Sequence, residues 1–506
     1  MQASNRIIVN TAAQYIRTIL NLVLSLYSSR LVLQILGVDD YGIYSLVAGL
    51  VSMLSFFTNS LVSSTQRFLS ICQGRNNITA LKKVFSNSLL IHIILGIIIF
   101  FILESLSPFL FNGFLNIPYG RESSAIVLYQ QVLLMVYISF VTSPYRALLV
   151  SRENIVYTSF IDVVDGVLKV LLVLLLPILS TDMLEAYGWI MLSISCFNFL
   201  AFAVYSHLKY EECILPRFRL FEWSYVKDLF QFTGWITYST ACITLRMQGV
   251  AIILNRMMGP VINAAFGIGS QINSMVGFLC TSINNAIAPQ LMSAEGGNNR
   301  DRMWYFSKIS SKFAFLLLSM VGIPVMFEMH FLLDLWLVEV PQNTILFACT
   351  FLIMQIIDQL TIGLLMAKKA IGKIGFFSFV TYTPKLLILP IGWYVFHIGG
   401  NLETLCLIFI IVELLCMIIR IPLLRHEDGF NPSEYIADVF IRPFMPVLMS
   451  IMICFIFNNW FNEGWLRLIL TFLVSIGCFI SFTYYFSLTR SEKDKVWMIL
   501  SKMYRR

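Results

Sequence analysis

Fourteen apolar stretches, each about as long as a bilayer is thick, run through this chain of 506 residues from Ile8 to Leu488. A hydrocarbon core of about 30 Å takes roughly 20 apolar residues of helix to cross, and a backbone in lipid must satisfy its polar groups internally. The composition agrees, because 58% of the residues are hydrophobic and only 12% are charged. The sequence therefore predicts an all-α, polytopic membrane protein of about fourteen transmembrane helices.

The predicted spans form two groups of six and a final pair. They cover 8–36, 41–71, 84–109, 125–150, 155–179, 184–208, then 229–258, 262–292, 306–333, 343–367, 374–396, 402–423, and finally 440–457 and 465–488. We expect an N-lobe over 1–208, a cytoplasmic linker over 209–228, a C-lobe over 229–425, and a C-terminal helix pair with a basic tail over 426–506.

Lysine and arginine collect in alternate connections, and this bias predicts which way the helices point. One set of connections holds most of these residues, whereas the other holds mainly Arg121 and carboxylates. Both termini are therefore expected in the cytoplasm. The net charge of +7 reflects this bias, and we do not expect a nucleic-acid partner.

An internal repeat appears when the sequence is shifted by 222 residues. The matched turn residues are Gly37 with Gly259, Gly74 with Gly296, and Asn76–Asn77 with Asn298–Asn299. Because the shift spans six helices, both halves point the same way. This predicts two pseudo-symmetric six-helix lobes that enclose a central cavity and rock against each other.

Polar residues recur every three or four positions along the spans that open each half, and so share one helical face. The first span carries Asn10, Gln14, Arg17, Asn21, Ser25 and Ser28, the second carries Asn59 and Arg67, and the seventh carries several threonines and Gln248. Such faces are costly in lipid and favour a wet cavity. For the hydroxyl residues, close helix packing is the alternative.

The arginines within spans are the sharpest signal, because a charge at the bilayer centre is costly and is a functional hypothesis by default. Arg17 and Arg246 lie near span centres, so we expect them to line the cavity. Arg30 and Arg67 lie nearer span ends, where headgroup contact competes. Arg146, Arg420 and Arg442 are expected to anchor at the cytoplasmic edge.

A cavity that holds arginines favours an anion, since guanidinium matches phosphate oxygens and stays charged. Asp162, Asp165 and Lys169 share one face of the fifth span, and Asp165 and Lys169 could neutralise each other. If transport is coupled to protons or sodium, the candidate carboxylates are Asp162, Asp165 and Asp358.

The sequence carries no catalytic or nucleotide-binding motif that we searched for, and neither its ten cysteines nor its five histidines have metal-site spacing. We therefore expect a transporter without cofactor or metal. A membrane-embedded polymerase or glycosyltransferase would need catalytic carboxylates or a large outer loop.

The segment LGVDDYGIY, Leu36–Tyr44, resembles the LGxxxYGxY signature of polysaccharide-export flippases, the Wzx-type O-antigen or capsule repeat-unit flippases. The segment LNRMMGPVINAAFGIGSQI, Leu254–Ile272, lies where that family repeats the signature. The family belongs to the multidrug/oligosaccharidyl-lipid/polysaccharide exporter superfamily, whose MATE-like fold has two six-helix lobes. The first span here lacks the carboxylate typical of its drug extruders.

The resemblance implies a flippase of the bacterial cytoplasmic (inner) membrane that moves undecaprenyl-diphosphate-linked oligosaccharides to the outer leaflet. Arg17, Arg30, Arg67 and Arg246 would hold the diphosphate, while Asn21, Asn59 and Gln248 would contact sugar hydroxyls. A polysaccharide polymerase and assembly proteins are the implied partners, besides membrane lipid. The alternatives within the superfamily are a peptidoglycan-precursor flippase and a cation-coupled multidrug exporter.

Overall fold

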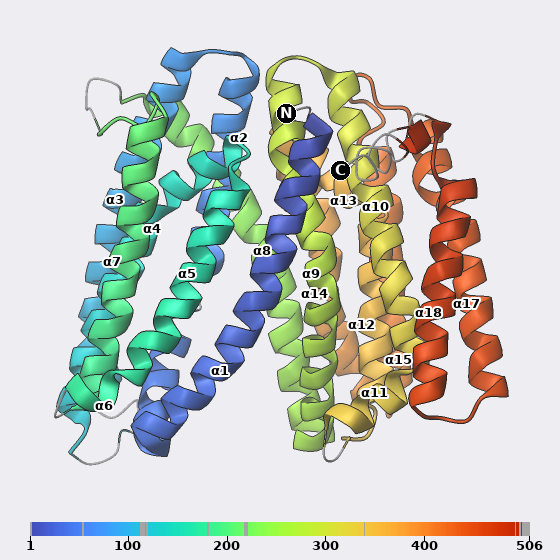
Figure 1. The fold of residues 1–506 in the computed structure, drawn as a ribbon, viewed down its shortest axis with the longest axis horizontal. Helices are drawn as coiled ribbons and strands as arrows, with labels where there is room; N and C mark the ends of the chain where they lie inside the picture. Colours follow the sequence, from blue (N-terminus) through green and yellow to red (C-terminus); the bar gives the residue numbers. More distant parts are fainter. Residues whose placement is uncertain are drawn as a thin grey trace. The chain divides into compact units, whose positions relative to one another are not determined.

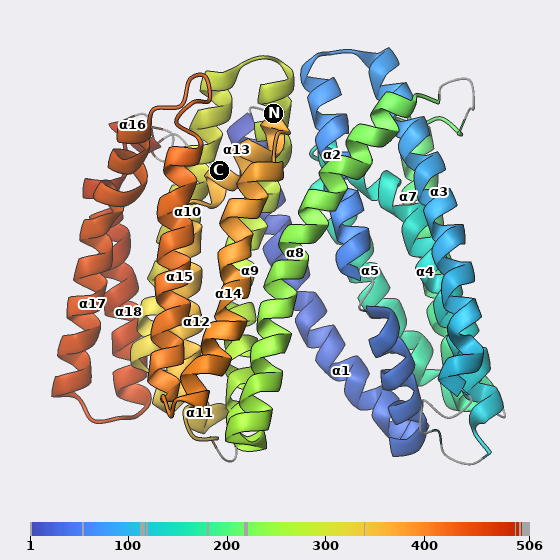
Figure 2. The ribbon, with the colours of Figure 1, turned by 180° about the vertical axis from the view of Figure 1, so that it is seen from behind.

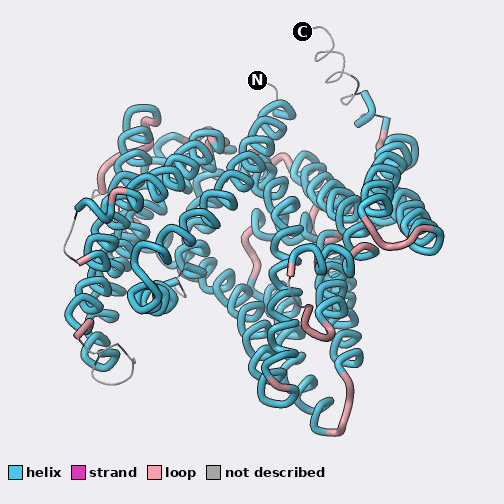
Figure 3. Tube along the Cα trace, turned by 60° about the horizontal axis from the view of Figure 1, so that its bottom comes forward, coloured by secondary structure: helices cyan, strands magenta, loops and turns pink. Residues whose placement is uncertain are grey.

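The computed structural model describes residues 3–52, 55–111, 117, 120–179, 182–216, 221–337, 340–490, 492–494 and 497. Within these residues every regular element is a helix (Figure 1, Figure 3). The first half comprises α1 (Ala3–Ser52), α2 (Ser55–Gly74), α3 (Ile78–Phe109), α4 (Glu122–Ser151), α5 (Ile155–Leu174), α6 (Leu176–Leu179) and α7 (Met183–Lys209).

The remaining helices are α8 (Trp223–Met258), α9 (Pro260–Gly296), α10 (Arg300–Phe327), α11 (Met329–Trp336), α12 (Thr344–Gln359), α13 (Ile362–Ile371), α14 (Gly375–His397), α15 (Leu402–Leu423), α16 (Pro432–Ile436), α17 (Arg442–Trp460) and α18 (Trp465–Phe482). A π-helical turn, Ala437–Ile441, joins α16 to α17, and another, Thr483–Ser487, extends α18. Helix α8 begins at Trp223, inside the linker predicted over 209–228.

The predicted all-α membrane architecture is confirmed, and each predicted span overlaps at least one helix. Among the described residues, eight helices are long and apolar enough to cross a membrane, or nine if α12 and α13, bent by 48°, form one broken span. The predicted spans outside this set lie in α1, α2, α5, α8 and α9. Of these helices, α1, α2, α8 and α9 carry the polar stripes, and α5 carries the three charged residues Asp162, Asp165 and Lys169. The total of fourteen stays a prediction.

The turns of the internal repeat have matching backbone conformations. Gly37, with φ of 78°, kinks α1, and its repeat partner Gly259, with φ of 89°, separates α8 from α9. Asn76 and Asn298 likewise have φ of 52° and 56°. Positive φ is uncommon outside glycine and is best tolerated by Asn and Asp. The agreement at two successive turns therefore supports the 222-residue repeat.

The chain divides into two compact units. Unit 1 comprises Met1–Thr237 with Met292–Asn299, and unit 2 comprises Tyr238–Leu291 with Arg300–Arg506. The boundary falls inside α8 and near the end of α9. A compact unit need not coincide with one half of the internal repeat. The predicted lobe limits therefore stay a prediction.

In unit 1, α4 packs along α3 and α7, as Figure 2 shows, and α1 packs along α5. Phe85 of α3 meets Tyr145 of α4 edge to face, with ring centroids 5.4 Å apart, and Phe202 of α7 belongs to the same buried cluster. Lipid is as apolar as these side chains, so close packing rather than escape from water holds the helices together. This packing brings the charged face of α5 against α1 and α4.

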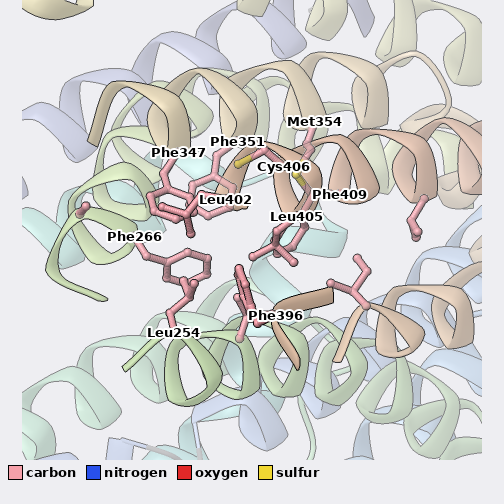
Figure 4. Close-up of a cluster of buried hydrophobic side chains, with 14 of the residues drawn as sticks. Leu254, Phe266, Phe347, Phe351, Met354, Phe396, Leu402, Leu405, Cys406 and Phe409 are labelled. Carbon is pink, nitrogen blue, oxygen red and sulfur yellow. The ribbon is translucent and has the colours of Figure 1, made fainter. Parts of the chain in front are cut away.

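One buried hydrophobic cluster of unit 2 includes Phe266, Phe347, Phe351, Phe396 and Phe409 (Figure 4). Phe266 of α9 lies 5.4 Å from Phe347 and 5.1 Å from Phe351 of α12, measured between ring centroids. Phe351 in turn contacts Phe409 of α15 at 6.0 Å. These edge-to-face contacts fasten α9, α12 and α15 around the charged residues described below.

The helix pair α17 and α18 packs against α10 in unit 2. Arg467 of α18 donates two hydrogen bonds of 3.1 and 2.9 Å to Oε2 of Glu328, which lies between α10 and α11 and is only 1% exposed. Thr471 donates to the other carboxylate oxygen at 3.0 Å. A buried ion pair this well satisfied is specific to one docking arrangement. The pair is therefore an integral part of unit 2.

Candidate functional site

One face of α5 carries the charges at the centre of unit 1. Lys169 Nζ lies 2.7 Å from Asp165 Oδ2, four residues earlier. Asn198 of α7 donates a hydrogen bond of 2.6 Å to the other oxygen of Asp165. The predicted neutralisation of Asp165 by Lys169 is therefore present, and an amide from a second helix supports it.

Asp162 lies on the same face of α5, and one of its carboxylate oxygens accepts hydrogen bonds from two arginines. Arg17 of α1 donates to Asp162 Oδ2 at 2.8 Å, and Arg146 of α4 donates to the same atom at 2.7 Å. The Arg146 guanidinium also lies 5.8 Å from the centre of the Phe202 ring. The position of Arg146 at the membrane edge stays a prediction, and its guanidinium forms an ion pair with a carboxylate of α5.

Two cavities flank this charged face, and both lie wholly in unit 1. The first, of about 400 Å³, includes Asn21, Ser25, Ser28, Tyr41, Tyr44, Tyr187, Asp165 and Lys169 in its lining. The second, of about 440 Å³, includes Thr58, Asn59, Ser139, Thr142, Arg146, Asp162, Ser195, Asn198, Asp165 and Lys169. Asp165 and Lys169 are common to both. Hydroxyl and amide groups therefore surround the charges of α5 on two sides.

The asparagines predicted to contact substrate both reach these cavities. Asn21 lines the first cavity, and its Oδ1 is buried without a hydrogen-bond partner among the described residues. Asn59 is exposed and lines the second cavity. Of the predicted arginines of unit 1, Arg30 lies on α1, but its side chain is outside the described part of the structure.

Arg67 of α2 occupies a different setting. It is buried, and its guanidinium lies 5.0 Å from the centre of the Phe68 ring and 4.6 Å from that of Phe232 on α8. Stacking on aromatic faces suits guanidinium, which is weakly hydrated and planar. Arg67 therefore fastens α2 to the start of α8 and is not part of the lining of either cavity described above.

Unit 2 holds a linear chain of alternating charges. Glu413 of α15 accepts from Lys385 of α14 at 2.6 Å on Oε1 and from Arg246 of α8 at 3.4 Å on Oε2. Lys385 Nζ lies 3.8 Å from Asp358 Oδ1, which accepts a bond of 2.8 Å from Arg420. Cations at both ends and in the middle thus alternate with two carboxylates.

Arg420 was expected at the cytoplasmic edge, and that prediction is wrong. Its side chain is only 1% exposed and also donates to Thr361 Oγ1 at 3.0 Å. Gln248, predicted to contact sugar, lies exposed on α8. The closeness of Arg420 to the end of its span did not predict its environment, because its long side chain reaches inward to Asp358.

The charge clusters of the two units contain the same number of cations and the same number of carboxylates. In unit 1 the linked groups are Arg17, Arg146 and Lys169 against Asp162 and Asp165. In unit 2 they are Arg246, Lys385 and Arg420 against Glu413 and Asp358. Each set holds three cations and two carboxylates within the helices of its unit. The surplus cation in each unit can hold an anion.

The sequence does not show which pairs form among the charges Lys385, Glu413 and Asp358, and it gives no partner for Arg146 or Arg420. The available signal was that a charge inside an apolar span needs a partner of opposite sign. That rule predicts that each charge has a partner, but it does not identify which residue the partner is. The structure brings Arg17, Asp162 and Asp165 to the charged face of α5 in unit 1 and joins Arg246 and Asp358 through one chain of charges in unit 2, whereas Arg67 lies apart from both.

Comparison with known proteins identifies similar sequences over the first part of the chain. A family model described as polysaccharide biosynthesis protein matches residues 4–295. An uncharacterized membrane protein, EpsK of Bacillus subtilis (strain 168), is 22% identical over 297 residues. That match covers 56% of this chain and 56% of EpsK, so the match spans little more than half of that relative.

Solved transporter structures share the fold. Structures of MATE in the straight and bent conformations superpose with TM-scores of 0.71 and 0.70, each at 15% identity. They cover 86% and 91% of this chain, and 97% and 98% of their own. A MOP superfamily transporter from Pyrococcus furiosus has a TM-score of 0.69 at 14% identity, covering 83% of this chain and 94% of its own.

Proposed function

This chain belongs to the polysaccharide biosynthesis protein family, and from that premise we propose that it is a flippase for undecaprenyl-diphosphate-linked oligosaccharide repeat units. Family and fold together make it a multi-pass membrane transporter of the MOP superfamily. The proposed substrate is an O-antigen, capsule or related repeat unit. It would enter from the cytoplasmic leaflet of the bacterial inner membrane and leave in the outer leaflet by alternating access.

The observation that carries the proposal is the surplus of one cation in each charge cluster, which is partly exposed in unit 1 and largely buried in unit 2. A cationic drug would call for a surplus of carboxylates, so this balance disfavours a cation-coupled multidrug exporter. A diphosphate is the kind of anion that guanidinium groups bind through paired hydrogen bonds. Arg17 and Arg246, on the helices that open each half of the repeat, are the proposed grips.

The polar cavities of unit 1 suit the sugars of such a substrate. Asn21 has an acceptor oxygen without a partner among the described residues, and Asn59 is exposed in the second cavity. Amide and hydroxyl groups exchange hydrogen bonds readily with sugar hydroxyls. The prenyl tail would stay in lipid. A polysaccharide polymerase and assembly proteins remain the proposed partners on the outer side.

The three candidate coupling carboxylates differ in how firmly they are neutralised. Asp162 is held by two arginines, and Asp358 by Arg420 and Lys385. Among the cations that the structure describes, Asp165 pairs with Lys169 alone, and it lines both cavities. A carboxylate between two cations keeps its charge most firmly. We therefore assign ion coupling to Asp165.

Complementation tests the proposed function. In a strain that lacks its own repeat-unit flippase, the wild-type chain restores surface polymer, while Arg17→Ala and Arg246→Ala reduce it about tenfold or more, as expected from losing a charge-assisted hydrogen bond to the substrate. Arg442→Ala is the matched control, because Arg442 pairs with Asp438 on its own helical segment. Wild-type polymer from both arginine variants would reject the diphosphate grip.

A second strain distinguishes the nearest alternative. The peptidoglycan-precursor lipid carries the same diphosphate but a different sugar. In a strain depleted of its peptidoglycan-precursor flippase, the proposed function predicts no rescue of growth. Rescue there, without restored surface polymer in the first strain, would assign the chain to that alternative.

A further inference from the structure

Each arginine proposed to grip the diphosphate shares its carboxylate with a second cation. In unit 1, Asp162 Oδ2 accepts from Arg17 at 2.8 Å and from Arg146 at 2.7 Å. In unit 2, Glu413 binds Lys385 at 2.6 Å and Arg246 at 3.4 Å. The carboxylate therefore keeps a close cationic partner even when the gripping arginine leaves it.

The two arrangements are built from different helices. In unit 1 the carboxylate lies on α5 and the second cation on α4, whereas in unit 2 they lie on α15 and α14. Only the gripping arginine comes from equivalent helices, α1 and α8. The 222-residue repeat therefore does not account for the shared layout, since it would have placed the partners on equivalent helices too.

The cost of breaking a buried ion pair explains why a second cation matters. Removing one partner of an isolated buried pair leaves an uncompensated charge, which is strongly destabilising. Glu413 is only 2% exposed, so it would pay that penalty if Arg246 were its only partner. Lys385 removes the penalty, and Arg146 likewise compensates Asp162, whose side chain is 18% exposed and would pay a smaller penalty.

Arg246 is also the more loosely held of the two cations on Glu413. Its contact is the longer one, and its buried Nε has no hydrogen-bond partner among the described residues. A guanidinium with an unused buried donor gains a hydrogen bond when a further acceptor arrives. Arg246 is therefore held weakly by Glu413 and has an unused donor with which to bind an incoming anion.

We infer that Asp162 and Glu413 are exchangeable counter-ions for the substrate diphosphate. In the empty transporter they neutralise Arg17 and Arg246. When a diphosphate binds in either unit, it takes over the guanidinium group of that unit, while Arg146 in unit 1 or Lys385 in unit 2 keeps the carboxylate neutral. The inference rests on the proposed function, and it makes Asp162, Glu413, Arg146 and Lys385 positioning residues that set the strength of the grip.

Equilibrium binding to the purified full-length chain tests the exchange, with farnesyl diphosphate as the probe at constant salt. Asp162→Asn removes the competitor, so the probe binds about tenfold tighter, as expected from freeing one charge-assisted hydrogen bond. In an Arg17→Gln background the same substitution has little effect, because no competition remains. Arg146→Gln weakens binding, because Asp162 then depends on Arg17 alone.

A charge control separates exchange from general electrostatics. Asp165→Asn changes the charge of unit 1 by the same amount but contacts neither Arg17 nor Arg146. Its effect is therefore equal in the wild-type and Arg17→Gln backgrounds. The corresponding set in unit 2, Glu413→Gln with and without Arg246→Gln, repeats the test independently if an Asp162 variant does not yield folded, monodisperse protein.

The outcomes distinguish the two levels of the proposal. If Arg17→Gln weakens binding but Asp162→Asn acts equally in both backgrounds, the exchange is refuted and the grip stands. If neither Arg17→Gln nor Arg246→Gln changes the affinity for farnesyl diphosphate, the proposed function falls and the exchange falls with it. Non-additivity confined to the arginine–carboxylate pairs supports the exchange.

Discussion

Guanidinium groups at membrane depth in this chain bind carboxylates from helices far away in sequence. Arg17 and Asp162 are 145 residues apart, and Arg246 and Glu413 are 167 apart. An unpaired charge in a bilayer is costly, and a partner of opposite sign lowers that cost. At the scale of single residues, the identity and the number of the cations that pair with each carboxylate are therefore the informative features.

Asp165 tests the assignment of ion coupling. Asp165→Asn removes the only one of the candidate carboxylates that has a single cationic partner, so an imposed proton or sodium gradient should no longer stimulate transport in proteoliposomes. Transport without a gradient should persist. Asp438→Asn, whose carboxylate lies outside both cavities, is the control. Gradient stimulation that survives Asp165→Asn would contradict the assignment.

Asp182 gives a prediction for pH. Partial burial opposes its ionisation, but hydrogen bonds from Ser124, the Glu185 backbone N–H and Arg121 outweigh it and lower the pKa of Asp182 below its ordinary value. A lowered pKa in the folded state stabilises the protein above the unfolded-state pKa of about 3.9. That stabilisation is lost as pH falls through the folded-state value.

Thermal unfolding in detergent measures this effect. Asp182→Asn should lower the melting temperature at pH 7, and the difference from wild type should shrink as the pH is taken below about 4. Asp428→Asn is the control, because its side chain is 93% exposed. A difference for Asp182→Asn that stays constant down to pH 3 would show that its ionisation plays no part.

At the scale of elements, glycines determine how closely two helix ends approach. Gly74 closes α2, and a Cβ built there would lie 2.0 Å from the Ser293 carbonyl oxygen of α9. A Cβ at Gly296 would lie 2.2 Å from the Ile71 carbonyl oxygen. Gly74 and Gly296 are matched by the 222-residue repeat, so the ends of equivalent helices meet backbone to backbone within unit 1.

Substitution of Gly74 should separate these ends. Gly74→Ala forces a methyl group against backbone atoms that cannot rotate away, so we expect a loss of about 1–3 kcal/mol in stability. Gly234→Ala is the matched control in the same unit, because its Cβ meets nothing within 4 Å. Thermal unfolding distinguishes the two, and equal melting temperatures would show that the crossing relaxes freely.

At the scale of the whole molecule, orientation in the membrane follows from the loops. Lys368, Lys369 and Lys373 surround the turn between α13 and α14, whereas the turn between α14 and α15 carries no lysine or arginine. Positive residues favour the cytoplasmic side. We therefore expect the two turns on opposite faces of the membrane, and we propose that both termini lie in the cytoplasm.

Reporter fusions measure that topology. Alkaline phosphatase fused after Gly399, in the turn between α14 and α15, should be active because it reaches the outside. The same enzyme fused after Gly372 or at the C-terminus should be inactive, and a fluorescent protein at the C-terminus should be bright. An active phosphatase at the C-terminus would reverse the proposed orientation.

The helices, the membrane location, the repeated turns and the polar faces could all be predicted from the sequence, because each depends on residues close together in the chain. Segment length and hydropathy are local, and so is the left-handed turn that Gly37 and Asn76 favour. The sequence also identified Arg17 and Arg246 as residues that needed an explanation.

Only the tertiary structure decided which charges meet. Asp162 has no cation three or four residues away on its own helix, and the packing of α1 and α4 against α5 brought it two arginines. The sequence likewise predicts Arg420 at the cytoplasmic edge, whereas helix packing places its guanidinium against Asp358. Ion pairs form between whichever side chains the helix packing brings within a few ångströms, and that distance is not encoded by spacing along one helix.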